Sequence, residues 1–305
     1  LETSANPFVM SMGPERNATR RLNFAQAFNP IGSNLGVLLA ALLILPKVNP
    51  ATAEQRAAMS QETLLATQSA ELKAVMGPYV ALGLLYILLA VMIGRVKVVE
   101  RPVESTAGES GGPGRLMRLL RNKRYSFGVV AQYFNVSAQT CIWTYTLHYV
   151  TDALGVSDKI AGYWLQASLI VFLVFRFLMV GLMGPYDARK LLLLMCSLGV
   201  GLSLFAMVSV NILGVLAIVS LSACISLLFP TIYGEALLGL GEDTKYGAAG
   251  LVMAIIGGAT MPLVQSYIMD KTSPAVSYIT VAGCFVVVAA YGLYTLRAPR
   301  PVSAA

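Results

Sequence analysis

The stretch YSFGVVAQYFNVSAQTCIWTYTLHYV, residues 125–150, contains no Asp, Glu, Lys or Arg. An uncharged run of this length can cross the hydrocarbon core of a membrane as one helix. Similar runs recur along the chain, which is 56% hydrophobic and 12% charged, whereas about 25% of the residues in a soluble domain are charged. The runs lack the alternation of barrel strands. The sequence therefore predicts an all-α membrane protein.

Eight complete spans are predicted, with part of a ninth at residues 1–14. The eight are residues 22–46, 78–98, 125–150, 160–183, 190–209, 211–233, 247–269 and 275–297. The chain begins inside an apolar run and without Met, so we expect an N-terminally truncated fragment that lacks three spans and part of a fourth.

The basic residues are unevenly divided between the two membrane faces. With residues 15–21 on one face and alternation from there, sixteen of the 22 Lys and Arg residues share that face and five lie on the other. Such a bias marks the first face as cytoplasmic and places the C-terminus there. It also explains the net charge of +7 without nucleic acid as a partner.

A linker separates two groups of spans. Residues 101–114 are rich in Pro, Gly, Ser and Glu, which is typical of a flexible segment. In residues 115–124, apolar and basic side chains segregate as in a helix on the inner membrane surface, although a plain positive-inside anchor has the same composition. Transporters are often built from two similar bundles. The predicted domains are the remnant of an N-terminal six-helix bundle (1–98), a cytoplasmic linker with a basic surface helix (99–124), a complete C-terminal six-helix bundle (125–298) and a cytoplasmic tail (299–305).

Two predicted spans carry a stripe of polar side chains on one helix face. The stripes are Asn23, Gln26, Asn29 and Ser33 in residues 22–46, and Gln132, Asn135, Gln139 and Trp143 in residues 125–150. Amides donate to and accept from hydroxyl groups, and an aromatic plane covers the apolar face of a sugar ring. One amide alone is more simply explained as glue between helices. Two stripes favour a polar cavity, and Pro30 predicts a kink in the first helix.

Ionisable residues inside spans are costly and indicate working parts. Glu2 lies in an apolar stretch with Asn6 four residues later, which suggests a proton or substrate site. Arg176 needs a partner, and we expect an ion-pair latch that includes Asp187. Phe229 and Tyr233 flank Pro230 and are candidates for lining the cavity.

The sequence offers no sign of an enzyme. It has no Gly-rich phosphate loop, no His and Cys at metal-ligand spacing and no Ser–His pairing. The four cysteines are predicted to be buried small hydrophobes. They are Cys141, Cys196, Cys224 and Cys284. No metal site and no cofactor other than a coupling ion are expected.

Several longer motifs resemble one family. They are LNFAQAFNPIGS (22–33), AQ (131–132) with AQTCIW (138–143), FPTIY (229–233), and GEDTKYG (241–247) with IIGG (255–258). Over nearly its whole length the chain resembles the L-fucose–proton symporter family of the major facilitator superfamily, which includes glucose/galactose permeases. The resemblance implies about helices 4–12 of a twelve-helix fold that works by alternating access in the bacterial inner membrane, as a multi-pass monomer.

The resemblance also assigns roles to residues. Glu2 falls on the family's transport-critical glutamate and would couple protons, although some relatives use sodium. Gln26 and Asn29 fall on sugar contacts, and Trp143 on an aromatic near the sugar. Phe229 stands where a tyrosine is expected. The substrate-binding residues are then predicted to be Asn6, Gln26, Asn29, Asn135, Gln139, Trp143, Phe229 and Tyr233.

The first functional hypothesis is cation-coupled symport of a neutral hexose such as fucose, galactose or glucose. A sugar sensor without transport and a facilitator of another small polar solute, such as a nucleoside, are the alternatives.

Overall fold

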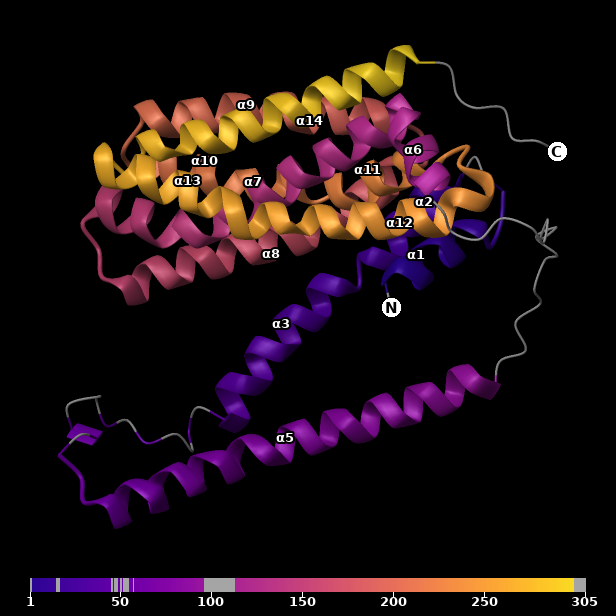
Figure 1. Ribbon diagram of the computed structural model, residues 1–305. Coiled ribbons are helices and arrows are strands. Elements are labelled where there is room, and N and C mark those ends of the chain that lie inside the picture. The colour runs from indigo at the N-terminus through magenta and orange to yellow at the C-terminus, as the bar shows by residue number, and fades with distance from the viewer. Residues whose placement is uncertain are drawn as a thin grey trace. The chain divides into compact units, whose positions relative to one another are not determined.

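The computed structural model describes residues 2–14, 17–44, 46, 49, 51, 55–56, 58–95 and 113–298. These residues form helices and no β-strand (Figure 1). Part of the predicted linker 99–124 and the whole predicted tail 299–305 lie outside the described residues. The chain divides into two compact units, residues 1–30 with 108–305 and residues 31–107, and each is described by itself.

Six helical segments in the described chain are long and apolar enough to cross a membrane. They are Gln61–Arg95, Asp158–Leu182, Ala188–Val208, Ile212–Leu237, Thr244–Lys271 and Val276–Arg297. Each matches one predicted span. The predicted span 125–150 is also one helix, α7 (Lys123–Leu154), but amides and tyrosines dilute its apolar residues. The all-α membrane architecture predicted from the uncharged runs is therefore confirmed.

The predicted span 22–46 is interrupted. Helix α2 (Ala18–Gln26) ends four residues before Pro30, and α3 (Asn29–Leu39) begins one residue before it. A proline ring clashes with the carbonyl four residues earlier but is tolerated in the first turn of a helix. The predicted kink is therefore a full break, and α3 continues into the π-helical turn η2 (Ala40–Ile44).

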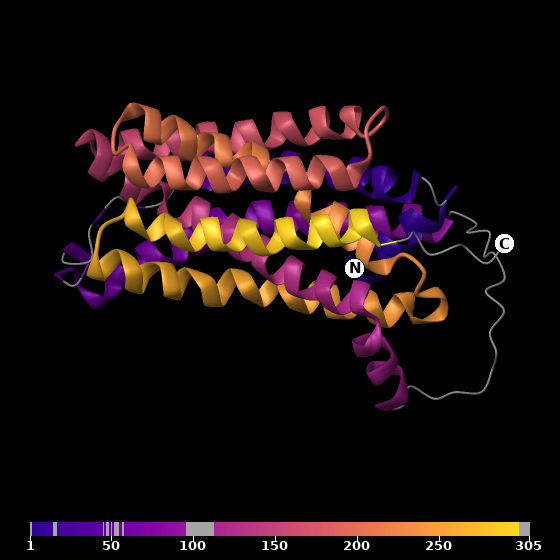
Figure 2. The ribbon, with the colours of Figure 1, turned by 90° about the horizontal axis from the view of Figure 1, so that it is seen from above.

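The larger unit contains most of the helices. They are α1 (Glu2–Ser11), α2, α6 (Pro113–Arg121), α7, α8 (Asp158–Leu182), α9 (Ala188–Val208), α10 (Ile212–Ile225), α11 (Leu228–Leu237), η4 (Gly241–Asp243), α12 (Thr244–Met253), η5 (Ala254–Ile256), α13 (Gly257–Lys271), η6 (Val276–Tyr278) and α14 (Ile279–Arg297). The long helices lie alongside one another in both views (Figures 1 and 2). Helix α7 packs against α8, α10, α11, α13 and α14 and is the centre of this bundle.

Close helix contact and a tyrosine-rich core hold the bundle together. A Cβ on Gly257 would lie 2.2 Å from the carbonyl oxygen of Tyr133, so glycine lets α13 approach α7. Tyr149 and Tyr278 are fully buried, and their rings meet edge to face at 5.5 Å. The four cysteines are buried as predicted.

Helices α1 and α2 belong to this unit by their contacts. Helix α1 packs against α2 and α12, and α2 packs against α8 and α11. The guanidinium of Arg21 donates to the carbonyls of Val9, Met10, Gly13 and Pro14 and so holds the turn between α1 and α2 together. The predicted division into bundles 1–98 and 125–298 stays a prediction, because compactness groups residues 1–30 with the later helices.

The smaller unit contains residues 31–39 of α3, η2 and the long helix α5 (Gln61–Arg95). Helix α5 begins inside the segment 47–77, which hydropathy places outside the membrane. Arg56 makes two hydrogen bonds to the carboxylate of Glu71, at 2.6 and 3.0 Å. The bond to Glu71 raises the pKa of Arg56 above its ordinary value.

A buried ion pair joins the beginning of α7 to α11. Arg124 Nη2 lies 2.9 Å from Glu235 Oε2, and both side chains are buried. We expect Glu235→Gln to destabilise the protein by about 3 kcal/mol, because it leaves a buried guanidinium without its counter-charge. Thermal unfolding of the detergent-solubilised protein measures this loss.

The double variant Arg124→Met/Glu235→Leu serves as the control and should recover most of the stability, since apolar residues replace a buried pair well. An unchanged unfolding midpoint in Glu235→Gln would contradict the assignment of the pair as a structural brace.

Candidate substrate and coupling site

Two amides on α7 are buried without hydrogen-bond partners. Gln132 and Asn135 are 0% and 1% exposed, and neither the nitrogen nor the oxygen of either amide is bonded. Gln139, one turn after Asn135, is half-buried. An unsatisfied buried polar group costs about 1–3 kcal/mol, so the protein keeps these amides at a cost. This face of α7 is suited to a ligand that offers both donors and acceptors.

Trp143 ends the same stripe. Its indole N–H donates to the hydroxyl of Ser222 at 3.2 Å, and its ring meets Phe172 edge to face at 5.2 Å. Ser222 in turn lies 2.6 Å from the hydroxyl of Ser168. The indole therefore uses its only donor inside the protein, in a network that joins α7, α8 and α10. Stacking against a sugar ring, the predicted role of Trp143, would use the face of the indole and stays a prediction.

Helices α1 and α2 bring a second pair of amides together. Gln26 Nε2 donates to Asn6 Oδ1 at 3.0 Å. Asn6 is 6% exposed, and its own Nδ2 has no partner. Glu2 begins α1 one turn before Asn6, so the two positions share a helix face, but the side chain of Glu2 lies outside the described residues. The structure thus places two predicted site residues in contact and a third one turn away in the chain.

The first predicted stripe does not act as one surface. Asn23 donates to the hydroxyl of Thr231 on α11 at 3.2 Å and to the carbonyl of Thr19 at 2.9 Å. It is a helix–helix contact. Asn29 lies beyond the break before Pro30, at the exposed start of α3. The proline break therefore separates Asn29 from the two amides of α2.

Helix α11 carries the predicted aromatic pair. The rings of Phe229 and Tyr233 are stacked, with centroids 6.2 Å apart and planes 18° from parallel. Tyr233 is buried and Phe229 is half-buried. Helix α11 packs against both α2 and α7, the two helices that carry the amide stripes. The aromatic pair thus belongs to the helix that connects the two groups of amides.

The predicted latch between Arg176 and Asp187 is replaced by other contacts. Arg176 is 4% exposed, donates to the carbonyl of Ser226 and lies over the ring of Phe172. Asp187 accepts from the backbone N–H of Arg189 and pairs with its guanidinium at 2.7 Å. Arg176 and Asp187, both among the described residues, form no ion pair with each other, which corrects the predicted latch.

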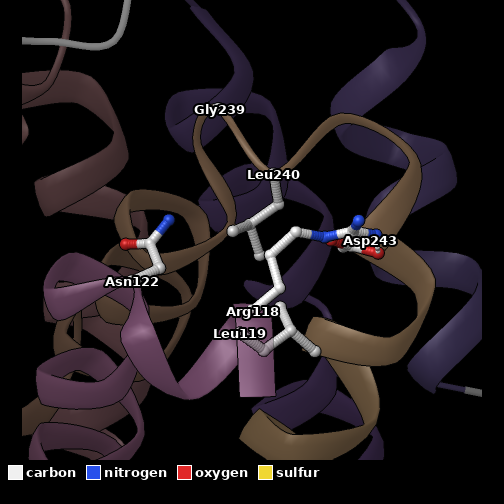
Figure 3. Close-up of a pocket in the computed structure, with 6 residues that line it drawn as sticks. All are labelled: Arg118, Leu119, Asn122, Gly239, Leu240 and Asp243. Carbon is white, nitrogen blue, oxygen red and sulfur yellow. Dashed lines mark hydrogen bonds and ion pairs between the residues drawn. The ribbon is translucent and has the colours of Figure 1, made fainter. Parts of the chain in front are cut away.

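Sequence reasoning missed the acidic residues that anchor one end of the bundle. Glu235 interrupts an apolar run, and that signal alone would have marked it as a buried ion-pair partner. Asp243 accepts two hydrogen bonds from Arg118, at 2.5 and 2.8 Å. This pair borders a pocket of about 340 Å³ that is lined by Arg118, Leu119, Asn122, Gly239, Leu240 and Asp243 (Figure 3). Among the described residues, no three His, Cys, Asp or Glu side chains gather as they would around a metal ion.

Comparisons with known proteins identify relatives over almost the whole chain. The L-fucose-proton symporter of Haemophilus influenzae is 36% identical over 304 residues, which cover 96% of this chain and 70% of that protein. The Escherichia coli L-fucose-proton symporter is 31% identical over 94% of this chain and 67% of its own length. A glucose/galactose transporter of Brucella abortus is 25% identical over 96% of this chain. No family model matches the chain.

Solved structures agree with these relatives. The chain matches a crystal structure of a variant of the E. coli fucose:proton symporter with a TM-score of 0.92 and 29% identity, over 97% of this chain and 73% of that one. It matches a major facilitator superfamily transporter crystallised in the outward conformation with a TM-score of 0.90 and 30% identity. The chain therefore belongs to the L-fucose–proton symporter family of the major facilitator superfamily.

Proposed function

We propose that this protein is a secondary active transporter that couples the uptake of a neutral hexose to a cation gradient. The observation that carries this proposal is the pair of buried, unbonded amides Gln132 and Asn135 on the central helix α7. Such groups match the alternating donors and acceptors of a sugar's hydroxyls. The named functions of the relatives, L-fucose-proton symport and glucose/galactose transport, give the substrate class its most specific support.

The coupling ion in this proposal is the proton, and Glu2 is the group that binds it. A carboxylate at membrane depth is costly when charged, and protonation removes that cost. Protonation of Glu2 would therefore bias the balance between outward-open and inward-open states. Sodium is the alternative coupling ion, and the uptake experiment below compares the two ions.

The proposed setting is a bacterial inner membrane. The protein would cross it several times as a monomer, with the C-terminus in the cytoplasm. The bias of Lys and Arg toward one face supports this orientation. The sugar and the lipid bilayer are its proposed partners.

Transport tests this function directly. We expect the protein, expressed from its entire gene and reconstituted in proteoliposomes, to accumulate radiolabelled L-fucose, galactose or glucose when the outside is made acidic. An uncoupler should abolish the accumulation, and an inward sodium gradient should not replace the proton gradient.

Saturable sugar binding without counterflow would instead establish a sensor. Flux of nucleosides in preference to all three hexoses in a competition panel would establish a different facilitator.

Replacing an unbonded amide should affect sugar binding and protein stability differently. We expect Asn135→Leu to leave the thermal stability unchanged or raise it by about 1 kcal/mol, because it removes an unsatisfied buried group. The same variant should weaken sugar binding by about tenfold through the loss of a hydrogen bond to the ligand. Isothermal titration and thermal unfolding measure the two effects.

Asn23→Leu is the matched control. Asn23 is as deeply buried as Asn135, at 1% exposed, but is bonded to Thr19 and Thr231. Its loss should destabilise the protein by about 1–3 kcal/mol. If Asn135→Leu destabilised the protein as much as Asn23→Leu, Asn135 would be structural and the proposed site would lose its main support.

Glu2→Gln tests the coupling. In the full-length protein, we expect this variant to keep sugar binding and exchange between equal pools but to lose uphill uptake, because an amide mimics the protonated carboxyl and cannot release its proton. Counterflow and proton-driven uptake measure the two activities side by side. Full accumulation by Glu2→Gln would exclude Glu2 as the coupling group.

A further inference from the structure

Helix α6 and the first turn of α7 form a strongly basic segment. Residues 113–124 contain five bases and no acid. The bases are Arg115, Arg118, Arg121, Lys123 and Arg124. Arg118 and Arg124 have carboxylate partners in Asp243 and Glu235. Arg121 and Lys123 are exposed and form no ion pair with any residue that the structure describes. Two positive charges are therefore available to a partner.

Helix α6 is held firmly in place. Leu119 is 4% exposed and packs in a cluster that includes Tyr125 and Leu237. The hydroxyl of Ser126 donates to the carbonyl of Leu120 at 2.8 Å. Figure 3 shows the side chain of Arg118 extending from α6 to Asp243. These contacts fix which side of the helix faces away from the bundle.

The outward side of α6 is apolar and basic at once. Met117 and Leu120 are 55% and 56% exposed. Leu120 lies three residues after Met117 and Arg121 lies four after it, so each of them shares a helix face with Met117. Two large exposed apolar side chains beside an unpaired guanidinium are typical of a helix that lies in the interface of a membrane.

The position of α6 in the chain leads to the same partner. Helix α6 ends at Arg121, four residues before the uncharged run 125–150 that is predicted to cross the membrane, so we expect the helix to lie near the membrane surface. An anionic phospholipid can meet both kinds of side chain at once, because its acyl chains cover the apolar residues and its phosphate binds the basic ones. A soluble phosphate compound would use Arg121 and Lys123 but would leave Met117 and Leu120 in water.

We propose that α6 is a binding helix for anionic phospholipids. Met117 and Leu120 enter the acyl-chain boundary, and Arg121 and Lys123 bind the phosphates. This surface lies outside the proposed sugar site, so the proposal stands or falls separately from the transport function.

A fluorescent label on α6 tests the proposal. The full-length protein with Leu120→Cys is labelled with nitrobenzoxadiazole; the native cysteines in the described chain are buried, which favours labelling of the new one. The protein is placed in nanodiscs of phosphatidylcholine alone or of equal parts phosphatidylcholine and phosphatidylglycerol. We expect quenching by the neutral quencher acrylamide to fall by about threefold when the anionic lipid is present.

Two controls give the result its meaning. Adding Arg121→Gln and Lys123→Gln should abolish the difference between the nanodiscs, and so should high salt, which screens exposed charges. A label at Lys245→Cys, exposed on α12, should show no difference. Equal acrylamide quenching at position 120 in the two nanodiscs, or an equal change at position 245, would overturn the proposal.

Discussion

Hydrocarbon offers no hydrogen-bond donor or acceptor, so a polar side chain inside a membrane helix must find its partner in the protein or on a ligand. Most polar groups in the bundle follow this constraint. Asn23 bonds to Thr231, Trp143 to Ser222, and Arg176 to the carbonyl of Ser226. Gln132 and Asn135 do not. Other buried amides in the described chain, Asn6 and Gln265, each keep one bonded side-chain atom, whereas Gln132 and Asn135 have none. These two amides therefore mark a place where the partner can come from outside the chain.

Different kinds of bond hold different parts of the larger unit together. Ion pairs join α7 to α11 and α6 to η4, and those between buried groups are costly to break. Helices α1 and α2, which belong to the predicted N-terminal bundle, dock through Asn23 to Thr231 and through Arg20 to the carbonyl of Val180 at 3.3 Å. The neutral bond of Asn23 contributes only about 1 kcal/mol and the charge-assisted bond of Arg20 about 1.5–3 kcal/mol, both less than the cost of breaking a buried ion pair. An interface that must open and close in alternating access is better served by such bonds than by buried ion pairs.

The sequence predicted the spans well because the cost of charge in a membrane is a property of the residues themselves. It predicted helix ends less well. Helix α5 begins at Gln61, in a polar segment that hydropathy assigns to a loop, because polar residues form helices as readily as apolar ones. The sequence also predicted the wrong partner for Arg176, because the observed partner is a backbone carbonyl. Helix α10 ends at Ile225, and the last carbonyls of a helix lack intrahelical donors, so Ser226 offers an acceptor that no count of charges reveals.

The candidate site was predictable where it depends on helical spacing and unpredictable where it depends on a break. The shared face of Gln132 and Asn135 follows from their spacing of three residues on α7. The contact of Gln26 with Asn6 joins two helices across twenty residues of chain, which helical spacing does not predict. The helix break before Pro30 divides the first stripe, and the spacing of its polar residues does not reveal this break. Interrupted helices are tolerated at membrane depth only where protein or a water-filled cavity surrounds them. In transporters such breaks lie at the substrate site. The end of α2 at Gln26, beside the unbonded nitrogen of Asn6, therefore has the same implication as the unbonded amides of α7: polar groups are held ready for a solute.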